Sequence, residues 1–148
     1  MQLVDIIQML IPILKLCGYK KKGLTWQKRI DNLSILFAIQ KSQYSNDMWY
    51  YSFGVSLNEL TGKKTVSMSD CQIQYHLEKG VKNVELTVND ISNLIKKWEE
   101  KYGTVEQLRK CAIEGRLPVQ TSNSAMRYLT SVNLATLTRG QKDRLCDS

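Results

Sequence analysis

Hydrophobic residues between positions 24 and 78 recur at every second position, which is the period of a β-strand that buries one face. Leu24, Trp26 and Ile30 share one side of an expected strand over residues 24–30. The same alternation predicts strands over residues 33–40, 49–58 and 71–78, with residues 84–88 as a candidate fifth strand. Short polar stretches such as Asp31-Asn32 favour antiparallel pairing in chain order.

Helical periodicity flanks these strands on both sides. An apolar helix is expected before Gly18, because glycine suits the left-handed position that ends a helix. After the strands, Asn89 is the expected N-cap of one helix, and Thr104 begins a second helix that closes at Gly115. A third helix is expected over residues 123–138.

The first helix is apolar apart from one narrow polar stripe, formed by Asp5, Gln8, Pro12 and Lys15. It lacks a basic leading segment and a cleavage site, which argues against a signal peptide. The apolar run is also too short and too interrupted to span a bilayer. We expect this helix to be buried, either under the sheet or in the interface of a homodimer.

Together these elements predict an α+β domain built on an antiparallel meander sheet of four or five strands. One face of the sheet is rich in aromatic and aliphatic residues, and we expect the N-terminal helix and the C-terminal helices to cover it. The other face is polar and is expected to stay open to solvent. The domain is expected over residues 1–140, followed by a polar tail over residues 141–148.

Charge and cysteine content narrow the function only slightly. The formal net charge of +7 favours acidic partners, either a nucleic acid or an acidic protein surface. The four cysteines lie far apart and show no metal-binding or redox spacing. We therefore expect reduced thiols in a cytoplasmic protein, without a metal ion or another cofactor.

The densest positive charge is a candidate basic patch formed by Lys20, Lys21 and Lys22. Because Gly23 follows these lysines, a solvated turn is their expected setting. Lys28 and Arg29 fall on opposite faces of the expected strand, so they cannot form one patch with each other. Trp26 is expected in the core, so the patch lacks the exposed aromatic ring that a nucleic-acid site would present.

Three stretches resemble, in order and spacing, a group of small bacterial domains known as domain of unknown function 4304: LKLCGYKKKGLTWQKR, FAIQKSQYSNDMWYYSFGVSLNEL and SDCQIQYHLE. The resemblance covers roughly residues 10–80 and implies that the lysine run is a framework feature. It implies no activity. Members are similar to small proteins of bacterial conflict and defence loci, so we expect an immunity or accessory protein of such a locus.

No catalytic constellation is visible in the chain. His76 is the only histidine, and strand alternation places Cys71 on the opposite face, which argues against a Cys–His pair. The sequence contains neither a glycine-rich phosphate loop nor a serine hydrolase motif. We therefore do not expect an enzyme.

The polar face of the sheet is the candidate binding surface, and Gly54 would let a ligand approach its backbone. Its residues are Arg29, Gln40, Ser42, Tyr50, Ser52, Asn58, Gln72, Gln74 and His76. We expect a non-enzymatic module that binds a protein partner through this face. One alternative is a nucleic-acid-binding accessory protein that uses the basic surplus, and another is a face that is merely solvated.

Overall fold

A computed structural model describes residues 3–41, 49–63, 65–77 and 87–130. Its strands form one antiparallel sheet in chain order: β1 (Lys20–Lys22), β2 (Thr25–Ile30), β3 (Leu33–Lys41), β4 (Trp49–Leu57), β5 (Ile73–His76) and β6 (Gln120–Thr121). The helices are α1 (Leu3–Leu16), α2 (Asn58–Thr61), the 3₁₀ helix η1 (Met68–Asp70), α3 (Val88–Tyr102), α4 (Val105–Glu114) and α5 (Asn123–Thr130). The predicted α+β meander is confirmed, with β1 and β6 as strands that the sequence did not indicate.

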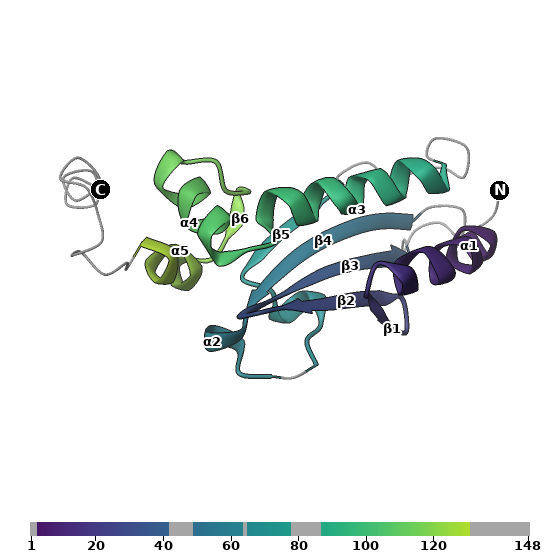
Figure 1. The fold of residues 1–148 in the computed structure, drawn as a ribbon, viewed down its shortest axis with the longest axis horizontal. Helices are drawn as coiled ribbons and strands as arrows, with labels where there is room; N and C mark the ends of the chain where they lie inside the picture. Colours follow the sequence, from purple (N-terminus) through teal and green to yellow (C-terminus); the bar gives the residue numbers. More distant parts are fainter. Residues whose placement is uncertain (1–2, 42–48, 64, 78–86, 131–148) are drawn as a thin grey trace.

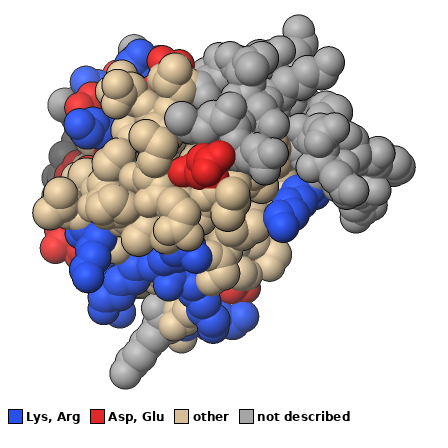
Figure 2. Space-filling view, turned by 90° about the vertical axis from the view of Figure 1, so that its right-hand side faces the viewer, with Lys and Arg blue, Asp and Glu red and all other residues tan. Residues whose placement is uncertain are grey.

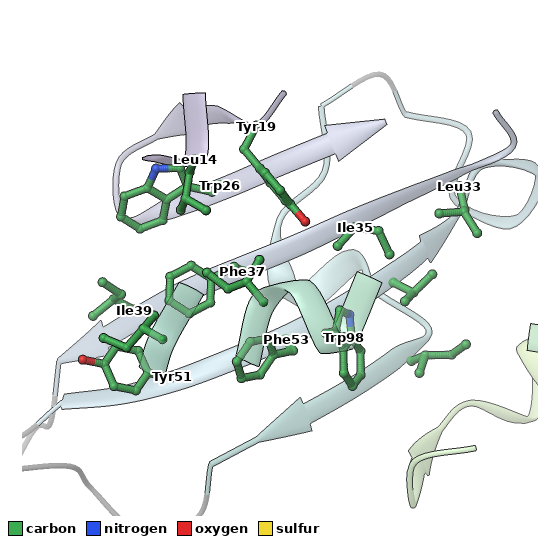
Figure 3. Packing of buried hydrophobic residues seen from close by; sticks show 14 of the residues in the cluster. Leu14, Tyr19, Trp26, Leu33, Ile35, Phe37, Ile39, Tyr51, Phe53 and Trp98 are labelled. Carbon is green, nitrogen blue, oxygen red and sulfur yellow. The ribbon is translucent and has the colours of Figure 1, made fainter. Parts of the chain in front are cut away.

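Helices α1 and α3 lie side by side over one face of the sheet (Figure 1). The residues expected on that face are buried: Trp26, Phe37, Phe53 and Ile73 are each no more than 3% exposed. Phe37 lies at the centre, with its ring centroid 5.6 Å from that of Trp26 and 5.5 Å from that of Phe53 (Figure 3). Burying each such side chain contributes about 1.5–3 kcal/mol, so this cluster fixes the strand register.

The predicted end of the first helix at Gly18 and the predicted turn at Asp31 are also present. Gly18 has a φ of 93°, and the backbone N–H of Tyr19 donates to Leu14 O to close α1. Asp31 has a φ of 49° in the two-residue turn between β2 and β3. The polar stripe of α1 faces solvent along its whole length, while Ile6 and Leu10 on the opposite side are buried.

The start of α3 differs from the prediction. Thr87, rather than Asn89, is the N-cap: its hydroxyl accepts a hydrogen bond from the N–H of Asp90, whose carboxylate accepts one from the N–H of Thr87. This reciprocal pair begins the helix two residues earlier, so Val88 is helical and not part of a fifth strand. Thr104 caps α4 as predicted. The rest of the candidate fifth strand, residues 131–138 of the last helix and the polar tail lie outside the described residues.

The second face of the sheet is less open than predicted. Residues 58–63 and 65–72, which we call the covering segment, run beneath the sheet on the side opposite α1 and α3 (Figure 1). Val66 and Met68 of this segment pack with Leu36 and Ala38 of β3 in a separate apolar cluster. The reason is that Leu36 and Ala38 give the predicted polar face an apolar centre, which is buried most favourably under another segment.

Candidate functional site

Many polar side chains of the candidate binding surface attach the covering segment to the sheet. Gln72 accepts a hydrogen bond from the N–H of Leu57 at 2.8 Å and donates one to the hydroxyl of Thr61 at 2.8 Å. Asn58 contacts the hydroxyl of Ser34 at 3.4 Å. These groups satisfy buried backbone and hydroxyl atoms, so they are occupied within the protein and not presented to a ligand.

His76 belongs to the same internal network. Its Nδ1 lies 2.7 Å from the hydroxyl of Ser52, the residue opposite it on β4, and its Nε2 lies 3.0 Å from Oε1 of Gln74. Gln74 in turn donates to the carbonyl oxygens of Met68 and Cys71, each at 3.0 Å. Because the amide oxygen of Gln74 only accepts, Nε2 is the donor in that contact. The Ser52 hydroxyl also donates to Oε1 of Gln40 at 3.5 Å. Ser52 is fully buried, so its hydroxyl is not an accessible nucleophile.

Cys71 lies on the other face from the one predicted. It precedes β5 and packs with Leu36 and Ala38, so the alternation of the strand does not extend to it. Its Sγ and the Sδ of Met68 fill the space above Gly54, where a ligand was expected to approach. Burial raises the pKa of the Cys71 thiol to about 12, so the thiol stays protonated at neutral pH and is a poor nucleophile.

Of the candidate binding surface, Ser52 is buried, and seven residues are exposed or partly exposed: Arg29, Gln40, Tyr50, Asn58, Gln72, Gln74 and His76. Ser42 lies outside the described residues. The covering segment occupies the centre of this face, and a binding role for the residues that remain exposed stays a prediction.

The candidate basic patch is part of a groove rather than a turn. Lys20 and Lys22 lie on the edge strand β1, opposite Gln27 and Thr25 of β2. The period of a strand places both lysines on the same face as Arg29, two residues beyond Gln27. Figure 2 looks at the end of the molecule that carries α1 and β1, and it shows Lys and Arg side chains gathered in a band along its lower part.

This basic groove has a volume of about 860 Å³ and runs between β1, β2 and the covering segment. Thr65, Val66 and Ser67 form its far wall. The side chains of Lys20, Lys22 and Arg29 form no hydrogen bond or ion pair with other described residues, so their charges are available to a ligand. No pattern along the chain indicated the far wall, because residues 62–70 follow neither strand nor helix period.

Asp70 is the one acidic side chain among the described residues that line the basic groove. It is already occupied: its carboxylate accepts a hydrogen bond from the N–H of Ser67 at 2.9 Å and pairs with Lys63 at 3.1 Å. The N–H of Ser67, and then the Lys63 ammonium, hold the pKa of Asp70 below its ordinary value, so Asp70 stays ionised. The groove nevertheless keeps a positive excess, because Lys20, Lys21, Lys22 and Arg29 also line it.

Lys28 is directed away from the basic groove, as the sequence predicted. Its ammonium lies 2.9 Å from Oε1 of Glu99 on α3 and 5.7 Å from the centre of the Tyr19 ring. The Tyr19 hydroxyl donates to the same carboxylate at 3.2 Å. Burial, and then the nearby Glu99, raise the pKa of Tyr19 well above its ordinary range. This cluster joins β2, α3 and the short link between α1 and β1, and it has a structural role.

Within the described ranges, no three His, Cys, Asp or Glu side chains come close enough to hold a metal ion. None of the helices in the described part of the chain is long and apolar enough to cross a membrane.

Comparison with known proteins gives one match. The model of a family described as a domain of unknown function (DUF4304) matches residues 10–119. No curated protein and no solved structure matches the chain. The predicted resemblance is therefore confirmed, and it extends beyond position 80 through α3 and α4.

Proposed function

Since the chain belongs to the family of this domain of unknown function, DUF4304, we propose its function from its own geometry: a non-enzymatic binding module that holds an acidic segment of a protein partner in the basic groove. The observation that supports this proposal is the convergence of Lys20, Lys22 and Arg29 on one groove. Their charges have no partner among the described residues, whereas Lys28 and Lys63 are paired.

The chemistry of the basic groove favours a protein segment over a nucleic acid. None of the described residues that line it is aromatic, so no ring is available for a base to stack on. Hydroxyl groups of Thr25, Thr65 and Ser67 line the groove beside the cations and suit carboxylates and peptide groups. β1 is also an edge strand of the described sheet, and an extended segment can add to such an edge through its backbone.

Electrostatics determines the strength of this binding. An exposed ion pair contributes about 0.2–1 kcal/mol, and a guanidinium such as that of Arg29 can hold a carboxylate through two parallel hydrogen bonds. Charges are screened over about 8 Å at physiological ionic strength, so the affinity should fall steeply with salt. The similarity of these domains to proteins of bacterial defence loci makes a toxin or defence protein encoded beside this chain the partner to test first.

The test uses a fluorescein-labelled peptide of about ten residues in which Glu and Ser alternate, with a Gln-Ser peptide of the same length as the neutral control. Fluorescence anisotropy at about 50 mM and about 150 mM salt gives the affinity of each peptide. We expect Lys20→Glu/Lys22→Glu to weaken binding of the acidic peptide by about tenfold or more, because reversal replaces two attractions with two repulsions.

The matched control is Lys96→Glu/Lys110→Glu, which makes the same change in net charge at exposed positions of α3 and α4. This control should leave the affinity within about twofold of the wild-type value. Equal losses in the two variants would show that only net charge matters and would overturn the proposal. Tighter binding of single-stranded DNA than of the acidic peptide, lost in the β1 variant, would favour the nucleic-acid alternative instead.

A further inference from the structure

A second groove lies at the opposite end of the sheet, between β5, α3 and the residues that join α4 to β6. Its volume is about 690 Å³. We call it the aromatic groove, because it combines rings with cations: Tyr75, Trp98, Tyr102, Lys97, Lys101 and Arg116. These six residues belonged to no site that the sequence predicted, whereas Gln74 and His76 of the candidate binding surface also line the groove. None of the six lines the basic groove.

The rings of the aromatic groove form a rigid platform. The centroid of Trp98 lies 6.3 Å from that of Tyr75, with the two planes at 26°, and 4.7 Å from that of Tyr102. The indole N–H of Trp98 donates to the carbonyl oxygen of Gly54 at 3.2 Å, so the indole orientation is fixed. Trp98 is only 7% exposed, whereas Tyr75 is 47% exposed. The platform therefore offers the ring of Tyr75 to a ligand.

Positive charge surrounds this platform. Lys97 and Lys101 are exposed and lie one helical turn apart on α3, on the side that lines the groove. Arg116 lines the groove from the other side and forms an ion pair with Glu114. No Asp or Glu is among the described residues that line the aromatic groove. Its ligand should therefore combine a flat ring with negative charge.

We propose that the aromatic groove binds a nucleobase that carries phosphate, either as a free nucleotide or within a single strand. The base stacks on Tyr75, and the phosphate lies between Lys97 and Lys101. Base–aromatic stacking and a cationic track for the backbone are the two elements of single-strand recognition, and here they occur together. The basic groove has the cations without the rings, so the two grooves select different ligands.

Two probes distinguish the sources of this ligand: ATP, and a fluorescein-labelled oligothymidine of about ten nucleotides. Fluorescence anisotropy with the full chain measures oligonucleotide binding directly and ATP by competition. We expect Tyr75→Ser to weaken binding by about 5- to 150-fold, the range that corresponds to the measured contribution of one stacked base. Tyr75→Phe keeps the ring and should bind within about twofold of wild type, which separates stacking from the hydroxyl.

Lys97→Gln/Lys101→Gln tests the phosphate contact without disturbing the core, because both side chains are exposed. It should reduce the slope of log affinity against log salt by about 0.7 for the oligonucleotide, which is the contribution of the one phosphate held between the two lysines. The matched control Lys96→Gln/Lys110→Gln should leave the slope unchanged. Competition by ATP would identify a nucleotide site, and binding of the oligonucleotide alone a single-strand site.

Three results would overturn the inference: binding of neither probe at about 50 mM salt, equal losses in the control, or wild-type affinity in a folded Tyr75→Ser protein. Circular dichroism and a melting curve establish that each variant is folded, and Tyr75→Phe provides the comparison if Tyr75→Ser is not. A loss of acidic-peptide binding in Lys97→Gln/Lys101→Gln would show that the peptide binds in the aromatic groove. If the peptide bound there more tightly than either nucleotide probe, the inference would also be contradicted.

Discussion

The close contact above Gly54 predicts that Gly54→Ala destabilises the protein. A Cβ atom at this position would lie 2.7 Å from Sγ of Cys71, 3.1 Å from Cβ of Cys71 and 2.8 Å from Sδ of Met68. In a strand without such neighbours, alanine is more stable than glycine by about 0.5–1 kcal/mol. Here the covering segment must shift, and extra volume in a packed site costs about 1–3 kcal/mol. For a chain of this size that corresponds to a melting temperature lower by about 2–12 °C.

Urea denaturation followed by tryptophan fluorescence gives the free energy of unfolding for wild type, Gly54→Ala, Cys71→Ala and the double variant. Because Cys71→Ala removes the nearest atom, the second substitution should cost less in that background, by about 0.5 kcal/mol or more. The clash should also loosen the covering segment and speed reaction of the Cys71 thiol with a disulfide reagent. A Gly54→Ala protein as stable as wild type, or additive effects of the two substitutions, would refute the packing described here.

Two further predictions concern titration and the His76 network. The contribution of the Cys71 thiol to the free energy of unfolding should stay constant below about pH 9. It should then decrease between about pH 9 and about pH 12. Burial raises the folded-state pKa from 9.0 to about 12, so the unfolded chain loses this proton first. Urea titrations should show a shallower decline for Cys71→Ala than for wild type, and parallel curves would contradict this. His76→Ala should cost about 0.5–1.5 kcal/mol of stability, because the buried hydroxyl of Ser52 loses its 2.7 Å partner and keeps only Oε1 of Gln40 at 3.5 Å. The acidic-peptide affinity at the basic groove should stay unchanged. Unaltered stability, or lost peptide binding by a folded variant, would count against that role.

The fold was predictable where burial imposes a regular period. Phe53 alternates with Ser52 and Gly54 in β4, and the predicted burial of Phe37 and Phe53 is confirmed. β1 was not predictable in this way, because three consecutive lysines have no apolar face. It becomes a strand by pairing with β2 across a turn that contains Gly23, which has a φ of 61°. The convergence of Lys22 and Arg29 on one groove depends on that pairing and is not visible along the chain.

The segment that covers the centre of the candidate binding surface was not predictable for a related reason. Alternation identified which side chains leave the sheet on the polar face, but not what else lies on that face. The covering segment has no period, so nothing indicated that Gln72 and Gln74 would hold it. The contact between Ser52 and His76 depends on the register of β4 against β5, which are separated by a long irregular connection. Cys71 belongs to this connection, because β5 begins only at Ile73, so strand alternation does not apply to it.

An edge strand made only of lysine also affects how copies of this chain meet each other. β1 is the outermost strand of the described sheet, and its three residues are exposed. Two copies that approached edge to edge would place these ammonium groups against each other, so the lysines oppose open-ended strand pairing and aggregation. Neutral substitutions at Lys20 to Lys22 would remove this protection together with the groove charge. Every binding measurement on such variants should therefore be accompanied by gel filtration. Weaker ligand binding and self-association of the protein would both reduce the apparent affinity.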